Sequence, residues 1–243
     1  MNRNEVIKYI VLRTIGNFLL LFALFGVGAT FGPALYYEAQ FRIDQARGIH
    51  YVIAETPSST STIPTVSQRT DLTTNSDVQL LVPKDTSFGI VIPKIGANAK
   101  IFPNVDPTNP SIFLPILQQG VAHAKGTVFP GMNGTIYLFA HSTDNFWDVG
   151  RYNAVFYLLK DLSKGDDIVV YYQGIRYDYI VDDSKIVNPD DTSYITNAQK
   201  TLHVNDPHVG SEQLILQTCW PPGTTLERLL VIAKPKRLTS LAY

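Results

Sequence analysis

The stretch LILQTCWPPGTTLERLLVIAKPK, residues 214–236, contains two apolar runs joined by a loop with two prolines and a glycine. Runs rich in Leu, Ile and Val that are interrupted by Pro and Gly are typical of neighbouring β-strands. Cys219, the only cysteine in the chain, lies at the end of the first run, and Arg228 begins the second. If the two strands pair, Cys219 and Arg228 lie at the same end of a sheet, where the prolines stop the hydrogen-bond ladder.

The strand pattern extends back from this stretch to about residue 80. Short runs of apolar and β-branched residues alternate with turn signals, and Gln173-Gly174 between two aromatic-rich runs predicts a hairpin. We therefore predict a mostly β domain over residues 80–243, a closed barrel or a sandwich of seven to eight strands, with short helical insertions such as 151–161. The other predicted strands are 88–93, 100–102, 135–140, 167–172 and 175–181.

The N-terminal part of the chain predicts a membrane anchor. Residues 15–35 contain no charged side chain, and 21 residues at about 1.5 Å each span a hydrocarbon core of about 30 Å. We predict a transmembrane signal-anchor helix over residues 15–37; a buried core helix and a cleavable signal sequence are the alternatives. The excess of basic residues before the helix predicts a cytoplasmic N-terminus at residues 1–14 and an exocytoplasmic domain.

Residues 38–79 separate the predicted helix from the predicted β domain. Residues 56–77 are dominated by Ser, Thr and Pro, and such a segment buries too little apolar surface to fold by itself. We interpret 38–79 as a membrane-proximal segment followed by a stalk. The whole chain is thus predicted to be a single-pass protein of the cell membrane.

A single cysteine in an exocytoplasmic domain leaves three possibilities: a packed small side chain, half of an intermolecular disulfide, or a reactive thiol. A thiol nucleophile needs a base, which is most often a histidine. His141 follows the apolar strand TIYLFA and is the first candidate for this base, with His123 second. A structural role for either histidine is the alternative.

Charge and motif content exclude other kinds of ligand. The chain has 20 basic and 21 acidic residues, so a nucleic-acid partner is not predicted. We predict no cofactor and no metal site. The pairs Asp182-Asp183 and Asp190-Asp191 are interpreted as solvated loop charges rather than Ca²⁺ ligands.

Four segments of the chain, in this order, resemble the sortase family of membrane-anchored cysteine transpeptidases. The similarity covers residues 88–236 and includes the threonine-cysteine pair followed by an arginine. The segments are IPKIGANAKI at 92–101, GVAHAKGTVFPGMNGTIYLFAHS at 120–142, LSKGDDIVVYYQGIRYDYIV at 162–181, and the stretch at 214–236. The resemblance implies a sortase-like closed β-barrel.

The resemblance also implies roles for individual residues. Cys219 matches the nucleophile, His141 its histidine partner, Arg228 the arginine that faces the reacting carbonyl, and Thr218 a residue that shapes the substrate site. His123 receives no catalytic role. Gln217 departs from the small or hydroxylated residue that many members have before this threonine, and Ser142 stands where an arginine follows the histidine.

The implied reaction begins with cleavage of a C-terminal sorting signal on a surface protein, through a thioester with the enzyme. An amine acceptor, on a cell-wall precursor or a pilin lysine, then receives the protein. A peptidoglycan transpeptidase of the L,D type is disfavoured, because that family has a Ser-x-Gly-Cys context and Cys219 is flanked by Thr218 and Trp220. A catalytically inactive, binding-only β-barrel on a membrane tether is the other alternative.

Overall fold

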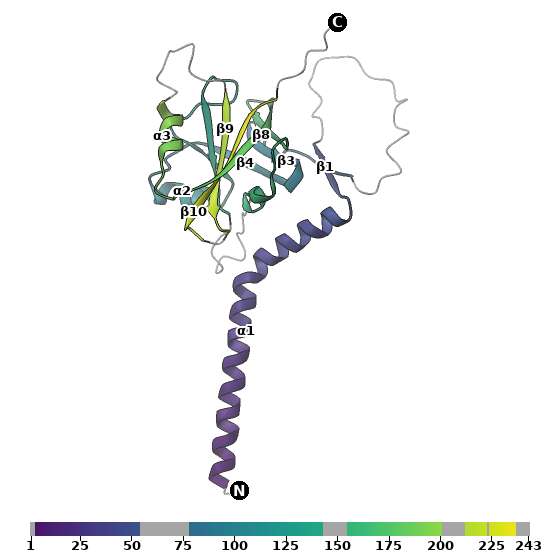
Figure 1. The fold of residues 1–243 in the computed structure, drawn as a ribbon, viewed down its shortest axis with the longest axis vertical. Helices are drawn as coiled ribbons and strands as arrows, with labels where there is room; N and C mark the ends of the chain where they lie inside the picture. The colour runs from purple at the N-terminus through teal and green to yellow at the C-terminus, as the bar shows by residue number, and fades with distance from the viewer. Residues whose placement is uncertain (1–2, 54–77, 143–154, 201–211, 223, 237–243) are drawn as a thin grey trace. The chain divides into compact units, whose positions relative to one another are not determined.

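A computed structural model describes residues 3–53, 78–142, 155–200, 212–222 and 224–236. The chain divides into two units, 1–44 and 45–243, which we describe separately (Figure 1). The predicted stalk, 56–77, lies outside the described residues.

The first unit is helical. Helix α1 (Arg3–Ala46) begins before the predicted span, and its stretch Arg3–Gly28 is long and apolar enough to cross a membrane, with a mean hydropathy of 2.1. Large apolar side chains such as Phe18, Leu21 and Phe25 are more than 60 % exposed in the isolated chain. A helix that leaves such side chains uncovered is suited to a lipid environment.

The second unit contains a closed barrel of eight strands, in the order β10-β8-β7-β3-β4-β5-β6-β9, which confirms the predicted fold class. Two neighbouring pairs, β4–β5 and β6–β9, are parallel, and the other pairs within the barrel are antiparallel. The strands are β3 (Phe88–Ile92), β4 (Ala97–Val105), β5 (Val121–Ala124), β6 (Thr135–Phe139), β7 (Asp167–Tyr172), β8 (Ile175–Val187), β9 (Gln213–Trp220) and β10 (Glu227–Pro235).

Local sequence explains several of these elements. Gln173 and Gly174 have φ angles of 51° and 78° and join β7 to β8, as the hairpin pattern predicted. Strand β8 is longer than the predicted 175–181, and a register irregularity between Ile232 and Ala233 bends its pairing with β10. Strand β5, of four buried residues, was not predicted, because its small side chains and histidine lack a strand-like composition.

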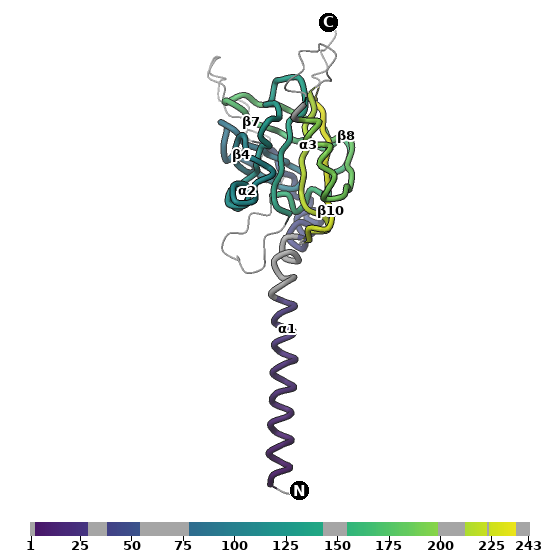
Figure 2. Tube along the Cα trace, turned by 90° about the vertical axis from the view of Figure 1, so that its left-hand side faces the viewer, coloured from purple at the N-terminus to yellow at the C-terminus, as the bar shows by residue number. Residues whose placement is uncertain are grey.

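The barrel has an apolar interior and two apolar patches on its outside. Alternate strand residues such as Ile136, Leu138 and Leu216 are fully buried and fill the interior. One outer patch lies under α2 (Pro110–Leu117) and α3 (Ser193–Lys200). Helix α2 packs on β4 and β5, and Figure 2 shows it beside β4. This patch leads to the end of the sheet where β9 stops.

The second outer patch receives the start of this unit. Strands β1 (His50–Ile53) and β2 (Val78–Leu81) pair in parallel, and Ile53 is buried against Val91, Val169 and Tyr171. The short 3-10 helices are η1 (Pro93–Ile95) and η2 (Tyr157–Asp161), and η2 occupies the described end of the helical insertion predicted at 151–161. Of the rest of that insertion, 155–156 form a turn and 151–154 lie outside the described residues.

Candidate active site

Strand pairing sets Cys219 opposite Arg228 and next to the strand that leads to His141. In the antiparallel pair of β9 and β10, Cys219 is directly opposite Arg228. In the parallel pair of β6 and β9, Phe139 is opposite Gln217, and the Ala140 amide continues the ladder by donating to the Gln217 carbonyl at 3.1 Å. Strand β6 ends at Phe139, and the same register extended by two residues would set His141 opposite Cys219. The three predicted catalytic residues therefore belong to one row of this extended register, with Cys219 and Arg228 on paired strands and His141 two residues past the end of β6.

All three residues of this row lie on the outer face of the barrel. Residues directly opposite one another in a sheet point to the same side, and so do residues two apart along a strand. Tyr137, Ile215 and Ile232 all belong to the patch under α2 and α3. Cys219 and His141 are each four residues from one of these, and Arg228 is four residues before Ile232. The row therefore lies at one end of the apolar patch under α2 and α3, on the side where β9 stops.

Cys219 is accessible at the end of its strand. Its side chain is a free, half-buried thiol, and Pro221 follows one residue after the last residue of β9. A thiol in the middle of a closed ladder would be covered by its neighbours. Within the described residues, the sulfur is only partly covered at the end of its strand.

Thr218 holds the two strand ends together. Its side chain points to the opposite face from Cys219, is 3 % exposed, and donates from Oγ1 to the Ala140 carbonyl at 3.1 Å. Ala140 immediately precedes His141, so this bond fixes the backbone that carries the imidazole relative to the backbone that carries the thiol. The structure gives Thr218 a positioning contact, and its predicted contact with substrate stays a prediction.

The loop between β9 and β10 orients the guanidinium of Arg228. One nitrogen, Nη1, donates to the carbonyl of Thr225 at 3.1 Å and to that of Glu227 at 3.0 Å. Within the described residues, these are the hydrogen bonds of this side chain, so Nε and Nη2 have no described protein partner. A half-buried guanidinium that is anchored by one nitrogen keeps a fixed direction for the other donors.

Two further rows continue the face below the row of Cys219. Phe139, Gln217 and Leu230 form the second row, and Tyr137, Ile215 and Ile232 form the third. Phe113 of α2 contacts Phe139 edge-to-face, with ring centroids 6.1 Å apart, and α3 adds Tyr194, Ile195 and Ala198 at the edge. The sequence alone did not identify these rows, because residues 137, 215 and 232 become neighbours only through strand pairing.

The phenol of Tyr137 is the buried polar group of this face. Tyr137 is 1 % exposed, and its hydroxyl donates to Oε1 of Gln217. Burial raises the pKa of the Tyr137 phenol above its usual range, so the group remains protonated and stays a donor. Neither Tyr137 nor the Tyr137–Gln217 pair was predicted from the sequence.

His123, the second candidate base, faces the barrel interior. Its partner across β5 and β6 is Leu138, and its ring stacks on Phe129 with centroids 4.5 Å apart. Nδ1 accepts from the Asn104 amide at 3.3 Å, and Nε2 lies 3.0 Å from the Val128 carbonyl. Burial lowers the pKa of this histidine, although the bond to Val128 opposes the shift. Both nitrogens are engaged on the opposite face from Cys219, which is a structural role.

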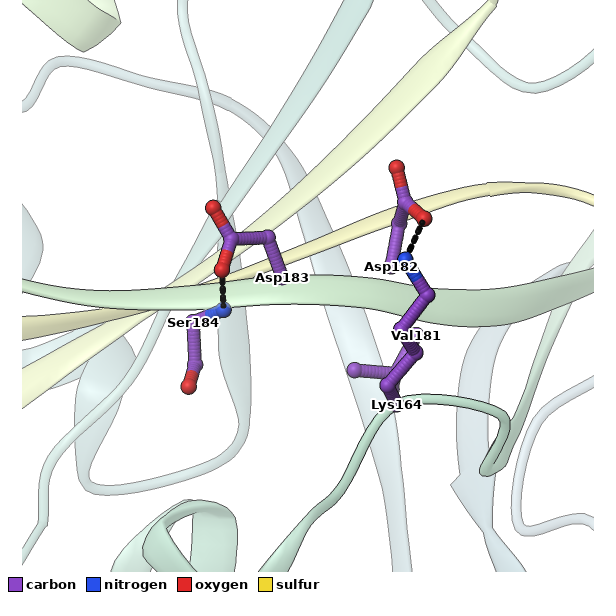
Figure 3. A pocket seen from close by; sticks show the side chains of 5 residues that line it. All are labelled: Lys164, Val181, Asp182, Asp183 and Ser184. Carbon is purple, nitrogen blue, oxygen red and sulfur yellow. Dashed lines mark hydrogen bonds and ion pairs between the residues drawn. The ribbon is translucent and has the colours of Figure 1, made fainter.

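The acidic pair Asp182-Asp183 lines an open hollow with Lys164, Val181 and Ser184 (Figure 3). The Asp182 carboxylate is 3.0 Å from the ammonium of Lys164 and 3.0 Å from that of Lys234, and these bonds lower its pKa. Asp183 accepts from the Ser184 amide. A carboxylate already paired with two ammonium groups is a poor Ca²⁺ ligand, and no group of three metal-binding side chains occurs among the described residues.

The barrel and its cysteine, histidine and arginine indicate one class of protein. Comparison of the chain with known protein families identifies that class. The family model described as the sortase domain matches residues 90–236. This chain therefore belongs to the sortase family. It is 30 % identical to sortase D of Bacillus subtilis (strain 168) over 146 residues, which are 59 % of this chain and 60 % of that protein.

One solved structure shows a similar fold, and a second is given for comparison of sequence. Sortase C1 of GBS pilus island 1 is 24 % identical, with a TM-score of 0.50 over 64 % of this chain and 66 % of that one. Sortase A from Corynebacterium diphtheriae is 26 % identical, with a TM-score of 0.49 over 66 % of this chain and 65 % of that one. The chain spans less than two thirds of the length of the sortase D and sortase C1 chains.

Proposed function

We propose that this protein is a membrane-anchored cysteine transpeptidase that cleaves surface proteins at a C-terminal sorting signal and joins them to an amine. The observation that carries the proposal is the pairing of Cys219 with Arg228 at open strand ends, next to the strand that leads to His141, in a barrel of the sortase family. The amine belongs to a cell-wall precursor or to a pilin lysine.

The first half of the proposed reaction forms a thioester. The Cys219 thiolate attacks a backbone carbonyl carbon of the donor protein, so that a C–S bond forms and the carbonyl oxygen becomes an oxyanion. The free donors of Arg228 stabilise that oxyanion or hold the donor backbone. When the tetrahedral intermediate collapses, the C–N bond breaks and the departing amine takes a proton from the imidazolium of His141.

The second half forms a new amide. The acceptor amine attacks the thioester carbon and gives a proton to the neutral imidazole of His141. The C–S bond then breaks and the thiolate of Cys219 is restored. If water replaces the amine, the same steps give hydrolysis of the donor.

The proposed location follows from α1. Its apolar stretch Arg3–Gly28 anchors the chain in the cell membrane as a single pass, and the basic residues near its start keep the N-terminus in the cytoplasm. The barrel then faces outward, where surface proteins and wall precursors are found. A cysteine introduced at one or the other end of the full Cys219→Ala chain, and labelled in intact cells with a thiol reagent that does not cross the membrane, tests this orientation.

The reaction is tested with the full-length protein in detergent micelles, a library of pentapeptide donors and several amines. We expect intact-mass spectrometry to detect an acyl adduct on Cys219, which hydroxylamine removes because it is a thioester. Added amine should convert the adduct to an amide product. The variant Cys219→Ala should show neither adduct nor product with its thermal unfolding preserved.

Donor cleavage that persists in Cys219→Ala at a comparable rate would eliminate the thiol mechanism. A folded protein that never forms an adduct with any donor would support the binding-only alternative.

A further inference from the structure

Strands β1 and β2 expose an apolar face. Their inner side packs on the barrel, where Ile53 is buried in the second outer patch and its partner Leu81 packs beside it. Neighbouring residues of a strand alternate sides, so the register sets Val52 beside Leu80 on the outward side, and Val82 continues this alternation just after β2. Four aliphatic side chains there are 49 % to 64 % exposed: Val52, Val78, Leu80 and Val82. We call these four residues the β1–β2 outer face.

The β1–β2 outer face is apolar rather than charged. Single exposed aliphatic residues are ordinary on a protein surface, whereas several that adjoin on one face mark an interaction surface. The charged residues that flank the two strands in the sequence are of both signs, with Arg47 and Lys84 against Glu55 and Asp77. The partner of this face is therefore expected to offer apolar contact rather than charge.

The chain holds this face close to the membrane. No charged residue occurs between Arg13 and Glu38, so the boundary of the predicted membrane span lies near Glu38. Helix α1 continues to Ala46, and β1 begins at His50. At about 1.5 Å per helical residue and up to about 3.4 Å per extended residue, His50 is within about 26 Å of that boundary. The β1–β2 outer face is thus confined to the layer next to the bilayer, whatever angle the chain makes there.

A lipid surface fits this face better than a second copy of the chain does. Stable protein interfaces take about 20–30 residues from each side, and this face offers four apolar side chains. A lipid surface needs no shaped partner, because aliphatic side chains can enter the boundary between headgroups and acyl chains. The anchor already holds the barrel beside the bilayer, so docking loses little further translational freedom.

We propose that the β1–β2 outer face docks on the lipid surface of the membrane that holds α1, so that the barrel rests on the bilayer. The proposal rests on the proposed membrane anchor and does not depend on the transpeptidase reaction. Ile53 packs on β3 and β7, which lie half-way round the closed strand order from β6 and β9. Docking therefore turns the row of Cys219 away from the lipid.

The test uses the full chain with Cys219→Ala, reconstituted in phosphatidylcholine vesicles. These vesicles carry no net charge, so the assay measures apolar contact. A single new cysteine carries a fluorophore whose emission depends on polarity, either at Lys84→Cys beside the β1–β2 outer face or at Ser111→Cys on α2, over the other outer patch. Both positions are exposed, and Lys84 has no ion pair among the described residues.

We expect the two probes to differ. The emission at Lys84→Cys should shift to shorter wavelength and be quenched by lipids that carry a nitroxide on the acyl chain. The probe at Ser111→Cys should keep the emission that it has in water and should not be quenched.

Two pairs of substitutions identify the side chains that make the contact. Val78→Ser with Val82→Ser should reduce the ratio of docked to undocked protein roughly tenfold, because two half-exposed aliphatic side chains no longer gain from burial. Ile112→Ser with Leu114→Ser is the matched control on α2, where the two side chains are 45 % and 44 % exposed, and should leave the ratio unchanged. Thermal unfolding of each variant checks that the barrel is intact.

Three other outcomes would overturn the proposal. Equal behaviour of the two probes, or quenching at Lys84→Cys that survives Val78→Ser with Val82→Ser, would show that the β1–β2 outer face does not contact lipid. A shift at Lys84→Cys that grows with the ratio of protein to lipid, without quenching by the labelled lipids, would assign the face to a second copy. If the chain does not float with the vesicles, the proposed anchor fails and the docking fails with it, whereas the acylation assays test the transpeptidase separately.

Discussion

Replacing Thr218 tests whether one buried hydrogen bond positions the two halves of the site. Thr218→Val keeps the shape of the side chain and removes the Oγ1 donor, which leaves the Ala140 carbonyl without this partner. Both residues are at most 5 % exposed, so water does not readily replace the bond. A buried acceptor left unpaired costs about 1–3 kcal/mol, and we expect the free energy of unfolding to fall by that amount.

Thr218→Ser makes the complementary change. It keeps the hydroxyl and removes one methyl group, with a cost of about 1 kcal/mol in lost burial. The two variants therefore lose similar stability for different reasons. Only the valine variant frees the backbone before His141, so we expect its acylation rate to fall roughly tenfold further, since about 1.4 kcal/mol of lost positioning corresponds to that factor.

The assay combines thermal unfolding of the full-length protein in detergent micelles with the rate of acyl-adduct formation on Cys219. The expected result is two variants with comparable midpoints of unfolding and clearly different acylation rates. Equal acylation by the two variants would refute the positioning role and leave Thr218 as a packing residue only.

Three other perturbations follow from the structure. Arg228→Lys keeps the positive charge but loses the planar set of guanidinium donors, so the acylation rate should drop by about 10²- to 10³-fold. Labelling of Cys219 by a methanethiosulfonate reagent should change little. Near-wild-type acylation would contradict hydrogen-bond donation from Arg228 to the oxyanion or the donor backbone. The pKa of His123 in the folded state is lowered below 6.5, so below that pH the unfolded chain binds one more proton and the free energy of unfolding should decline as pH falls. His123→Gln should flatten this pH dependence. An unchanged slope would assign the pH dependence to other groups. Ile53→Ala removes a side chain buried against Val91 and Tyr171 and should lower the free energy of unfolding by about 2 kcal/mol; an unaltered unfolding midpoint would show that β1 does not pack on the outside of the barrel in solution.

The sequence determined features that depend on local pattern. The apolar stretch near the N-terminus, the β7–β8 hairpin at Gln173-Gly174 and the class of the domain are set by composition and by period-two alternation over a few residues. Cys219 and Arg228 were also placed together from the sequence, because one short loop joins their strands. Their catalytic roles, like that of His141, stay predictions that the acylation assays test.

Tertiary structure decided which residues share a face with the thiol. His141 and Cys219 are far apart in sequence, and the parallel register of β6 and β9 brings together the strand ends that lead to them. A shift of one residue in that register would send the imidazole to the opposite face, where His123 lies. No local pattern records such a register, since it results from packing the whole barrel. For the same reason the contact between Tyr137 and Gln217 emerged only from the folded chain.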